Sequence, residues 1–409
     1  MIPRIFLLLL IFLSAVSSLH SQDKAYARSI VKELCTEDMH GRGYVDEGME
    51  LAAEFLEAEF QEIGLTPLFR EEQFLQALTV SVVAYPGRMK VQLDGKKLEP
   101  GVDFHVYPGS PSIRAKGFVS PQQDRDFLLI DQRSGGKPAL QGEEMSATMS
   151  STGSPVIQLT DQKLTWSLRQ QYQARGGVII QMSPDAPSPE SAKIRVDARH
   201  HPDYRVYNVA AKIQGKSDSI ILVTAHYDHL GRMGHRRKSG AYFPGANDNA
   251  SGIALMLDLA RYYMTKDEQP EYTLVFIAFG AEELGLMGSG YLVDHAPFAL
   301  ESIRFQINLD ICGTGDEGIQ VVNGSVLRPE FERLVAINDH FALLEKVKSR
   351  GERCNSDHCP FYLRGVPAFF IYTLGGARHY HDVYDTEEAL TLSEFEDLHR
   401  LLTHFINGF

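Results

Sequence analysis

Four mostly apolar segments in the second half of the chain restrict its possible folds more than any other feature. Segments that do not clearly alternate apolar with polar residues are expected to be strands buried on both faces. Helical patterns at 251–264, 328–341 and 391–406 are interleaved with them. This arrangement indicates a mixed, mostly parallel sheet covered by helices on both sides, which is a three-layer α/β/α sandwich. The four segments are DSIILVTAH (218–226), YTLVFIAF (272–279), IRFQINLD (303–310) and VPAFFIYT (366–373).

We assign residues 22–75 and 205–409 to this α/β domain. A helical pattern ends before Gly64 in the first part, and the second part opens with a strand-like segment at 207–215. We expect that strand to lie beside the strand at 218–226, joined to it by a turn.

Residues 76–204 contain short β-like runs separated by Gly, Pro, Asp and Ser, which predict a smaller β-rich inserted domain. Within this insert, the segment DQKLTWSLRQQYQARG (161–176) is expected to be a helix, with Trp166 as a packing residue.

The first residues, 1–21, have the pattern of a signal peptide. Arg4 precedes a short apolar run, and small residues follow it. We therefore expect an exported protein, periplasmic or secreted, without a stable membrane anchor after cleavage. Export permits disulfides, and whether Cys354 and Cys359 form one stays open.

The formal net charge of −13 argues against a nucleic-acid partner, because such binding uses a basic surface. We interpret the acidity as a contribution to solubility. The oligomeric state cannot be inferred from these features.

Histidines and carboxylates recur directly after the predicted strands. Each residue alone has a simpler interpretation, such as a helix cap, a turn residue or a structural hydrogen bond. Their repetition at successive strand ends instead favours one site, because ligands in open α/β sheets bind beyond the carboxyl ends of the strands. Imidazole and carboxylate together suit zinc. The residues are His226, Asp248, Glu282, Glu283, Asp310 and His381.

These motifs resemble those of the co-catalytic zinc exopeptidases of the bacterial leucyl aminopeptidase type, which are family 28 of metallopeptidase clan MH. The resemblance covers about 30–75 and 205–409, and residues 76–204 resemble the protease-associated insert of some members. The matching segments are NVAAKIQG, AHYDHLG, GANDNASG, AFGAEELGLMGS, INLDICG, SDHCPF with GVPAFF, and YHDVYDT.

The resemblance implies a peptide hydrolase with two zinc ions per chain. His226 and Asp310 would bind one zinc, Glu283 and His381 would bind the other, and Asp248 would bridge them. The remaining two roles would be catalytic: Glu282 as general base, and Asp228 as acceptor of the second N–H of the His226 imidazole.

Several nearby residues have more than one interpretation. His229 is expected to make a loop hydrogen bond rather than bind metal, and Cys312 is expected to be a buried thiol. Arg378 either favours acidic substrates or forms a surface salt bridge. Ser356 to His358 cannot easily form a catalytic triad, because three adjacent residues do not face one another in the required geometry.

The expected activity is removal of N-terminal amino acids from peptides. A single-zinc acyltransferase like glutaminyl cyclase and a carboxypeptidase of the same fold are the alternatives. A receptor-like member that has lost its metals predicts missing ligands, and none is missing here. The preferred N-terminal residue and the donor to the oxyanion stay open.

Overall fold

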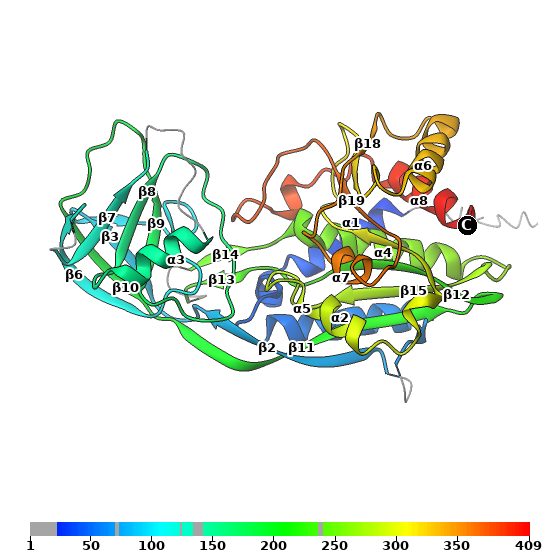
Figure 1. Ribbon diagram of the computed structural model, residues 1–409, viewed down its shortest axis with the longest axis horizontal. Helices are drawn as coiled ribbons and strands as arrows, with labels where there is room; N and C mark the ends of the chain where they lie inside the picture. Colours follow the sequence, from blue (N-terminus) through cyan, green and yellow to red (C-terminus); the bar gives the residue numbers. More distant parts are fainter. Residues whose placement is uncertain (1–22, 70–72, 123–124, 134–141, 236–239) are drawn as a thin grey trace, which may run out of the picture.

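A nine-stranded mixed sheet forms the larger part of the protein (Figure 1). The structure, a computed structural model, describes residues 23–69, 73–122, 125–133, 142–235 and 240–409. The strand order is β1-β11-β15-β12-β16-β19-β17-β18, and β2 also pairs with β11. The strands are β1 (Thr66–Pro67), β2 (Leu75–Ala84), β11 (Arg199–Ile213), β12 (Ser217–His226), β15 (Tyr272–Phe279), β16 (Ile303–Leu309), β17 (Ile319–Val322), β18 (Val347–Ser349) and β19 (Ala368–Thr373).

Both faces of this sheet are buried. In β12, Ile221 and Val223 pack in one hydrophobic cluster, whereas Ile220 and Leu222 pack in the cluster on the opposite face. Such burial explains why the strand is apolar without alternation. The first face is covered by α1 (Lys24–Leu34), α2 (Gly48–Ile63), α4 (Ser251–Met264), α6 (Arg328–Phe341) and α8 (Phe395–Asn407), and the second by α5 (Met287–Asp294) and α7 (His358–Tyr362).

The helices on the first face follow from their apolar spacing. In α8, Leu398, Leu401, Leu402 and Phe405 are buried, which places an apolar stripe on one side of the helix. Helix α2 ends at Gly64, whose left-handed backbone (φ 86°) lets its N–H reach the carbonyls of the last turn. The predicted α/β/α sandwich is therefore confirmed.

The predicted pairing of the strands at 207–215 and 218–226 is wrong. Strand β15 lies between β11 and β12, antiparallel to the first and parallel to the second. The short connection between β11 and β12 suggested a hairpin. The apolar β15 instead lies inside the sheet, where a neighbouring strand pairs with each of its edges.

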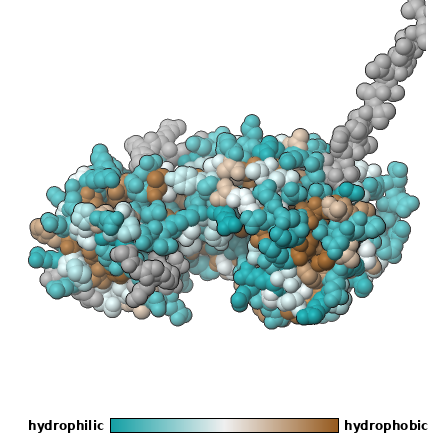
Figure 2. Space-filling model, turned by 90° about the horizontal axis from the view of Figure 1, so that it is seen from above, coloured by the Kyte–Doolittle hydropathy of each residue, from teal (hydrophilic) through white to brown (hydrophobic). Residues whose placement is uncertain are grey.

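A second, eight-stranded sheet lies between residues 89 and 196, in the order β4-β3-β10-β6-β7-β8-β9-β5. It has its own apolar core, and the paired strands β2 and β11 of the main sheet extend towards it (Figure 1). The outline of the molecule is indented between the two parts (Figure 2). Its elements are β3 (Met89–Leu93), β4 (Lys96–Leu98), β5 (Phe104–Val106), β6 (Ile113–Ser120), β7 (Phe127–Asp131), α3 (Gly142–Ser151), β8 (Val156–Thr160), β9 (Gly177–Gln181) and β10 (Ser191–Val196).

The helix expected at 161–176 is not formed. This segment is irregular, and its backbone is bonded to distant strands and loops rather than to itself. Val83 N–H, for example, donates to the carbonyl of Arg169, and Gln173 N–H donates to that of Gly109. Trp166 is buried, as expected for a packing residue.

The remaining elements are short. Strands β13 (Gly231–Met233) and β14 (Ala241–Phe243) pair with each other, and η1 (Glu37–Arg42), η3 (Ala246–Ala250), η4 (Leu300–Ser302) and η5 (Glu387–Ala389) are single turns or nearly so. Cys354 and Cys359 form a disulfide, while Cys35 and Cys312 are free. In the described ranges, no helix combines the length and apolarity needed to cross a bilayer. The predicted signal peptide, 1–21, lies outside those ranges.

Candidate metal centre

The candidate residues gather at one edge of the main sheet. His226 is the last residue of β12, Asp310 directly follows β16, and Glu282 and Glu283 follow β15. Strands β12, β15 and β16 are parallel neighbours, so their carboxyl ends share this edge. The topology therefore brings these side chains together.

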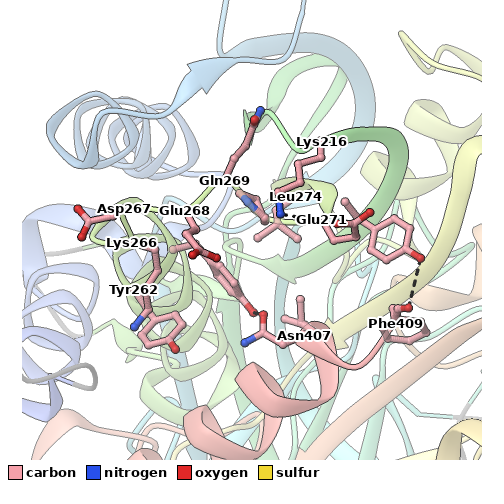
Figure 3. A pocket seen from close by; sticks show the side chains of 14 residues that line it. Lys216, Tyr262, Lys266, Asp267, Glu268, Gln269, Glu271, Leu274, Asn407 and Phe409 are labelled. Atoms are coloured by element: carbon pink, nitrogen blue, oxygen red, sulfur yellow. Dashed lines mark hydrogen bonds and ion pairs between the residues drawn. The ribbon is translucent and has the colours of Figure 1, made fainter.

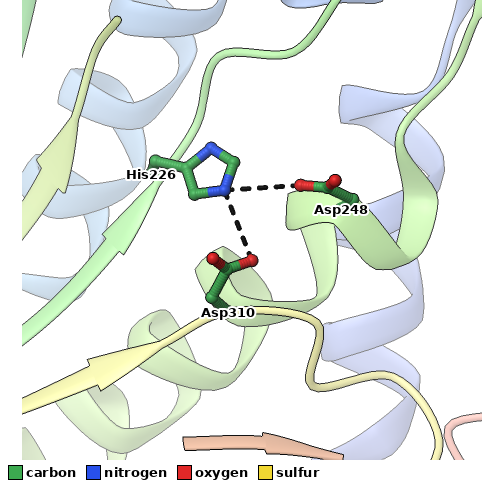
Figure 4. A group of neighbouring side chains, drawn as sticks. All are labelled: His226, Asp248 and Asp310. Carbon is green, nitrogen blue, oxygen red and sulfur yellow. Dashed lines mark hydrogen bonds and ion pairs between the residues drawn. The ribbon is translucent and has the colours of Figure 1, made fainter. Parts of the chain in front are cut away.

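Three of the side chains surround the end of β12. The Nε2 atom of His226 lies 3.3 Å from Oδ1 of Asp310 and 3.4 Å from Oδ1 of Asp248. Figure 4 shows both carboxylates directed at this edge of the imidazole. All three residues are buried, and their ligand atoms lie within 4.8 Å of one another.

A second group lies on the other side of Asp248. The Nε2 atom of His381 lies 3.3 Å from Oδ2 of Asp248 and 3.2 Å from Oε2 of Glu283. One oxygen of Asp248 thus faces His226 and the other faces His381. The Asp248 carboxylate lies between two sets of donors.

His229 belongs to the second group, although the sequence did not suggest it as a ligand. Its Nδ1 atom lies 2.9 Å from Oε1 of Glu283, and its ring is fully buried. His229, Asp248 and Glu283 offer ligand atoms within 4.8 Å of one another. The backbone N–H of His229 also donates to the carbonyl of Arg42.

Asp385 holds the loop that carries Asp248. Its two carboxylate oxygens accept the backbone N–H groups of Asn247 (2.9 Å) and Asp248 (3.0 Å). Gly245 precedes this loop with a left-handed backbone (φ 63°), and a Cβ there would come within 2.5 Å of the His229 ring. Burial raises the pKa of Asp385. Asp385 was not identified from the sequence, although it lies only four residues after His381.

Arg42 also supports this loop. Its buried guanidinium donates to the carbonyls of Tyr227, Pro244 and Gly245. These bonds join the residue that follows His226 to the loop that precedes Asp248. Arg42 was not identified from the sequence.

The Asp228 carboxylate lies near His226 but makes its shorter contacts with other groups. The Nδ1 atom of His226 lies 3.1 Å from the backbone carbonyl of Asp228 but 3.6 Å from its carboxylate. The carboxylate instead accepts the N–H groups of Glu282 (3.0 Å) and Glu283 (3.2 Å) and the hydroxyl of Tyr44 (3.1 Å). Asp228 therefore contacts the backbone of both glutamates.

The electrostatic surroundings favour bound cations. Burial lowers the pKa of His226, but the nearby Asp310 carboxylate raises it. The net result is a pKa well above the ordinary value of histidine. Burial likewise opposes protonation of His381, whereas Glu283 and Asp248 raise its pKa. Protons would therefore compete with a metal for both imidazoles.

Burial raises the pKa values of Asp248 and Glu283, but the neighbouring histidines lower both below their ordinary values. The pKa of Glu282 is shifted in the opposite direction. Burial raises the pKa of Glu282 well above its ordinary value; His226 lowers it, and the neighbouring carboxylates of Asp357 and Glu283 raise it further. Asp357 is itself buried, which raises its pKa to about 7, and its Oδ1 accepts the Ser289 hydroxyl.

The adjacent residues 356–358 do not form a triad. The Ser356 hydroxyl donates to Oδ2 of Asp310 (2.8 Å), and the His358 ring bonds the carbonyl of Arg353. Cys312 is buried in the core, in agreement with the prediction. Arg378 is largely exposed and lies 3.3 Å from Glu317, which is the surface salt bridge considered above.

A large pocket lies at the other edge of the same sheet (Figure 3). Its volume is about 690 Å³, and it is lined by Lys216 and Glu271, which directly precede β12 and β15. It is therefore at the amino ends of the strands, opposite His226. No histidine lines it among the described residues, and we assign no chemistry to it.

The donor set fits zinc. Its members are imidazole nitrogens and carboxylate oxygens, the ligands zinc takes in sites without cysteine. In the described part of the chain, every ion pair recorded for Asp248, Glu283 and Asp310 is with a histidine. A cation is the natural partner of so many clustered carboxylates.

Comparison with known proteins gives a family match for residues 208–406. Residues 208–406 match the sequence profile of Peptidase family M28. Aminopeptidase YwaD of Bacillus subtilis (strain 168) is 34% identical over 200 residues, which cover 46% of this chain and 40% of that protein. The match thus spans less than half of this curated relative.

Solved structures match over almost the whole chain. A zinc aminopeptidase from Bacillus subtilis superposes with a TM-score of 0.70 at 20% identity, covering 93% of this chain and 94% of the other. The aminopeptidase from Aneurinibacillus sp. strain AM-1 gives 0.67 at 18% identity, covering 94% and 93%. At this identity the likeness establishes the fold alone. Residues 208–406 are thus similar to peptidase family M28, and the whole chain shares the fold of these solved aminopeptidases.

Proposed function

We propose that the protein is a zinc-dependent aminopeptidase that removes N-terminal residues from peptides, with two zinc ions per chain. The position of Asp248 is the observation that carries this proposal. Its two oxygens lie 3.4 Å from Nε2 of His226 and 3.3 Å from Nε2 of His381. One carboxylate placed between two imidazole–carboxylate pairs is suited to bridging two metals.

The ligand roles follow from this arrangement. His226 and Asp310 would hold one zinc, Glu283 and His381 would hold the other, and Asp248 would contact both. Zinc bound there supplies Lewis acidity for the scissile carbonyl and lowers the pKa of water towards about 7. His229 lies close enough to the second zinc site to orient Glu283 through its 2.9 Å contact.

Glu282 is the proposed general base. Burial raises its pKa, which brings its proton affinity nearer to that needed at neutral pH. A proton taken by Glu282 could be returned to the leaving amine. Asp228 would position this residue, because its carboxylate accepts the backbone N–H groups of Glu282 and Glu283.

Export of the protein is part of the proposal. The signal-like pattern at 1–21 supports it, and a Cys354–Cys359 disulfide is consistent with an oxidising compartment. Expression with residues 1–21 present should yield mature chains outside the cytoplasm that begin near residue 22. Full-length chains retained in the cytoplasm would contradict export.

A substrate panel tests the activity. Aminoacyl anilides and free peptides should be cleaved from the N-terminus, and N-acetylated peptides should not. A chelator should abolish turnover, and zinc should restore it. Cleavage of the acetylated peptides, or release of C-terminal residues, would contradict the aminopeptidase assignment. One bound zinc instead of two would favour the acyltransferase alternative.

A further inference from the structure

The irregular segment 163–170 of the β-rich insert contacts the candidate metal centre directly. It belongs to the smaller part of the molecule, yet its partners lie in the two loops that carry His381 and Glu283. The role inferred below for this segment rests on the ligand roles proposed above.

Trp166 and His381 make a reciprocal pair of hydrogen bonds. The Trp166 N–H donates to the His381 carbonyl (2.9 Å), and the Trp166 carbonyl lies 2.7 Å from Nδ1 of the His381 ring. A carbonyl can only accept, so Nδ1 keeps its hydrogen in this contact, and a neutral ring has its free lone pair on Nε2, the nitrogen that faces Asp248 and Glu283. This tautomer is the one required for metal binding through Nε2.

The backbone of His381 needs such support. Its φ of 52° lies in the left-handed region, which non-glycine residues seldom adopt and which persists where the surroundings hold it. The two bonds to Trp166 restrain both its backbone and its ring.

Contacts at each end of the segment reach the same two loops. The Lys163 ammonium lies 2.5 Å from Oδ2 of the buried Asp382 and donates to the Arg378 carbonyl. At the other end, the Gln170 amide donates to the Leu284 carbonyl (3.0 Å), next to Glu283. A pocket of about 490 Å³ lies between 168–172 and 283–285.

The Trp166 indole anchors the segment in the apolar core that the insert shares with strands β13 and β14. Its Nε1–H donates to the Val106 carbonyl (3.0 Å), and its ring packs 5.0 Å from Phe243 and 6.0 Å from Tyr85. The position of the Trp166 carbonyl is thereby fixed by this shared core.

The other ligand pair is supported from within the peptidase part. Asp310 accepts the Ser356 hydroxyl, and His226 contacts the carbonyl of Asp228. We propose that segment 163–170 is a positioning element for one of the two metal subsites, the one formed by Glu283 and His381. The insert is then a structural component of that subsite.

Zinc binding tests this proposal without relying on activity. One variant combines Lys163→Met with Gln170→Ala, which removes both end contacts and leaves the core of the insert intact. Trp166→Ala removes the anchor itself. Ile194→Ala is the control, because it truncates a buried residue of the insert sheet outside the segment. Zinc affinity is measured by competition with a chelating dye, and the two subsites are resolved by ¹¹³Cd NMR.

We expect the double variant and Trp166→Ala to weaken one of the two affinities by roughly 10- to 100-fold, as is typical when support of a ligand is lost. Only one ¹¹³Cd resonance should shift, and Ile194→Ala should keep both metals. Unchanged affinities in both segment variants, or an equal loss in Ile194→Ala, would overturn the inference. A wild-type chain that binds no zinc would instead contradict the proposed function.

Discussion

Replacing Asp385 with asparagine isolates the support of the proposed bridging ligand. The carboxylate accepts two backbone N–H groups, from Asn247 at 2.9 Å and Asp248 at 3.0 Å, and the side chain is buried. Asparagine has nearly the same shape but only one accepting oxygen, so its amide NH₂ must face one of the two N–H groups.

The magnitude follows from the lost bond. A hydrogen bond to a charged group contributes about 1.5–3 kcal/mol, and an unpaired buried donor adds to its loss. We therefore expect Asp385→Asn to lower the free energy of unfolding of the metal-free protein by about 2–3 kcal/mol. If the displaced loop also misplaces Asp248, about 2 kcal/mol of lost metal binding corresponds to roughly 30-fold weaker zinc affinity.

Urea unfolding of the metal-free chain and zinc titration with a competing dye measure the two effects separately. Glu387→Gln is the matched control, because it removes a partly exposed ion pair with Arg28 (2.9 Å) two residues away. It should cost less than about 1 kcal/mol and leave zinc affinity unchanged. An Asp385→Asn chain with wild-type zinc affinity would refute the view that Asp385 positions Asp248.

Three further predictions concern single side chains. Glu282→Gln should keep both zincs but lower turnover by about 10²–10⁴, measured with an aminoacyl anilide; normal turnover would remove Glu282 from the base role. Asp248→Asn should lower the zinc content of the chain, measured by elemental analysis; full occupancy would contradict bridging. Burial lowers the pKa of His105 from 6.5 to about 4, so the unfolded chain binds more protons between these values and stability falls as pH falls through them. Between pH 7 and pH 5, protonation of His105 in the unfolded chain should lower the free energy of unfolding by about 2 kcal/mol. Urea unfolding of His105→Leu should show a smaller loss over the same range; an equal loss would contradict the assignment.

The strands and the clustering of the candidate ligands could be predicted from local patterns. Burial on both faces requires runs such as YTLVFIAF, and parallel strands end at one edge, which places His226 near Asp310. The supporting residues could not be predicted. Asp385, Arg42 and Ser356 act through hydrogen bonds to residues far away in the chain, and nothing in their own sequence neighbourhood reports such partners.

The errors have the same origin. The segment 161–176 has a helical pattern, but its bonds to β2 and to the loop of His381 compete with bonds inside a helix. The place of β15 between β11 and β12 likewise depends on which edges remain to be paired, and the short connection gave no information about that.

The amino-acid sequence by itself therefore determined the α/β class, the approximate places of the main strands and the residue types available to a metal. Periodicity and strand-end positions are local properties, and they can be read locally. Only the tertiary structure decided the order of the strands, the tautomer-setting contact between Trp166 and His381, and the position of Asp248 between two imidazoles. Those features depend on contacts between residues as many as 215 positions apart in the chain. The geometry of such contacts is defined only once the chain has folded.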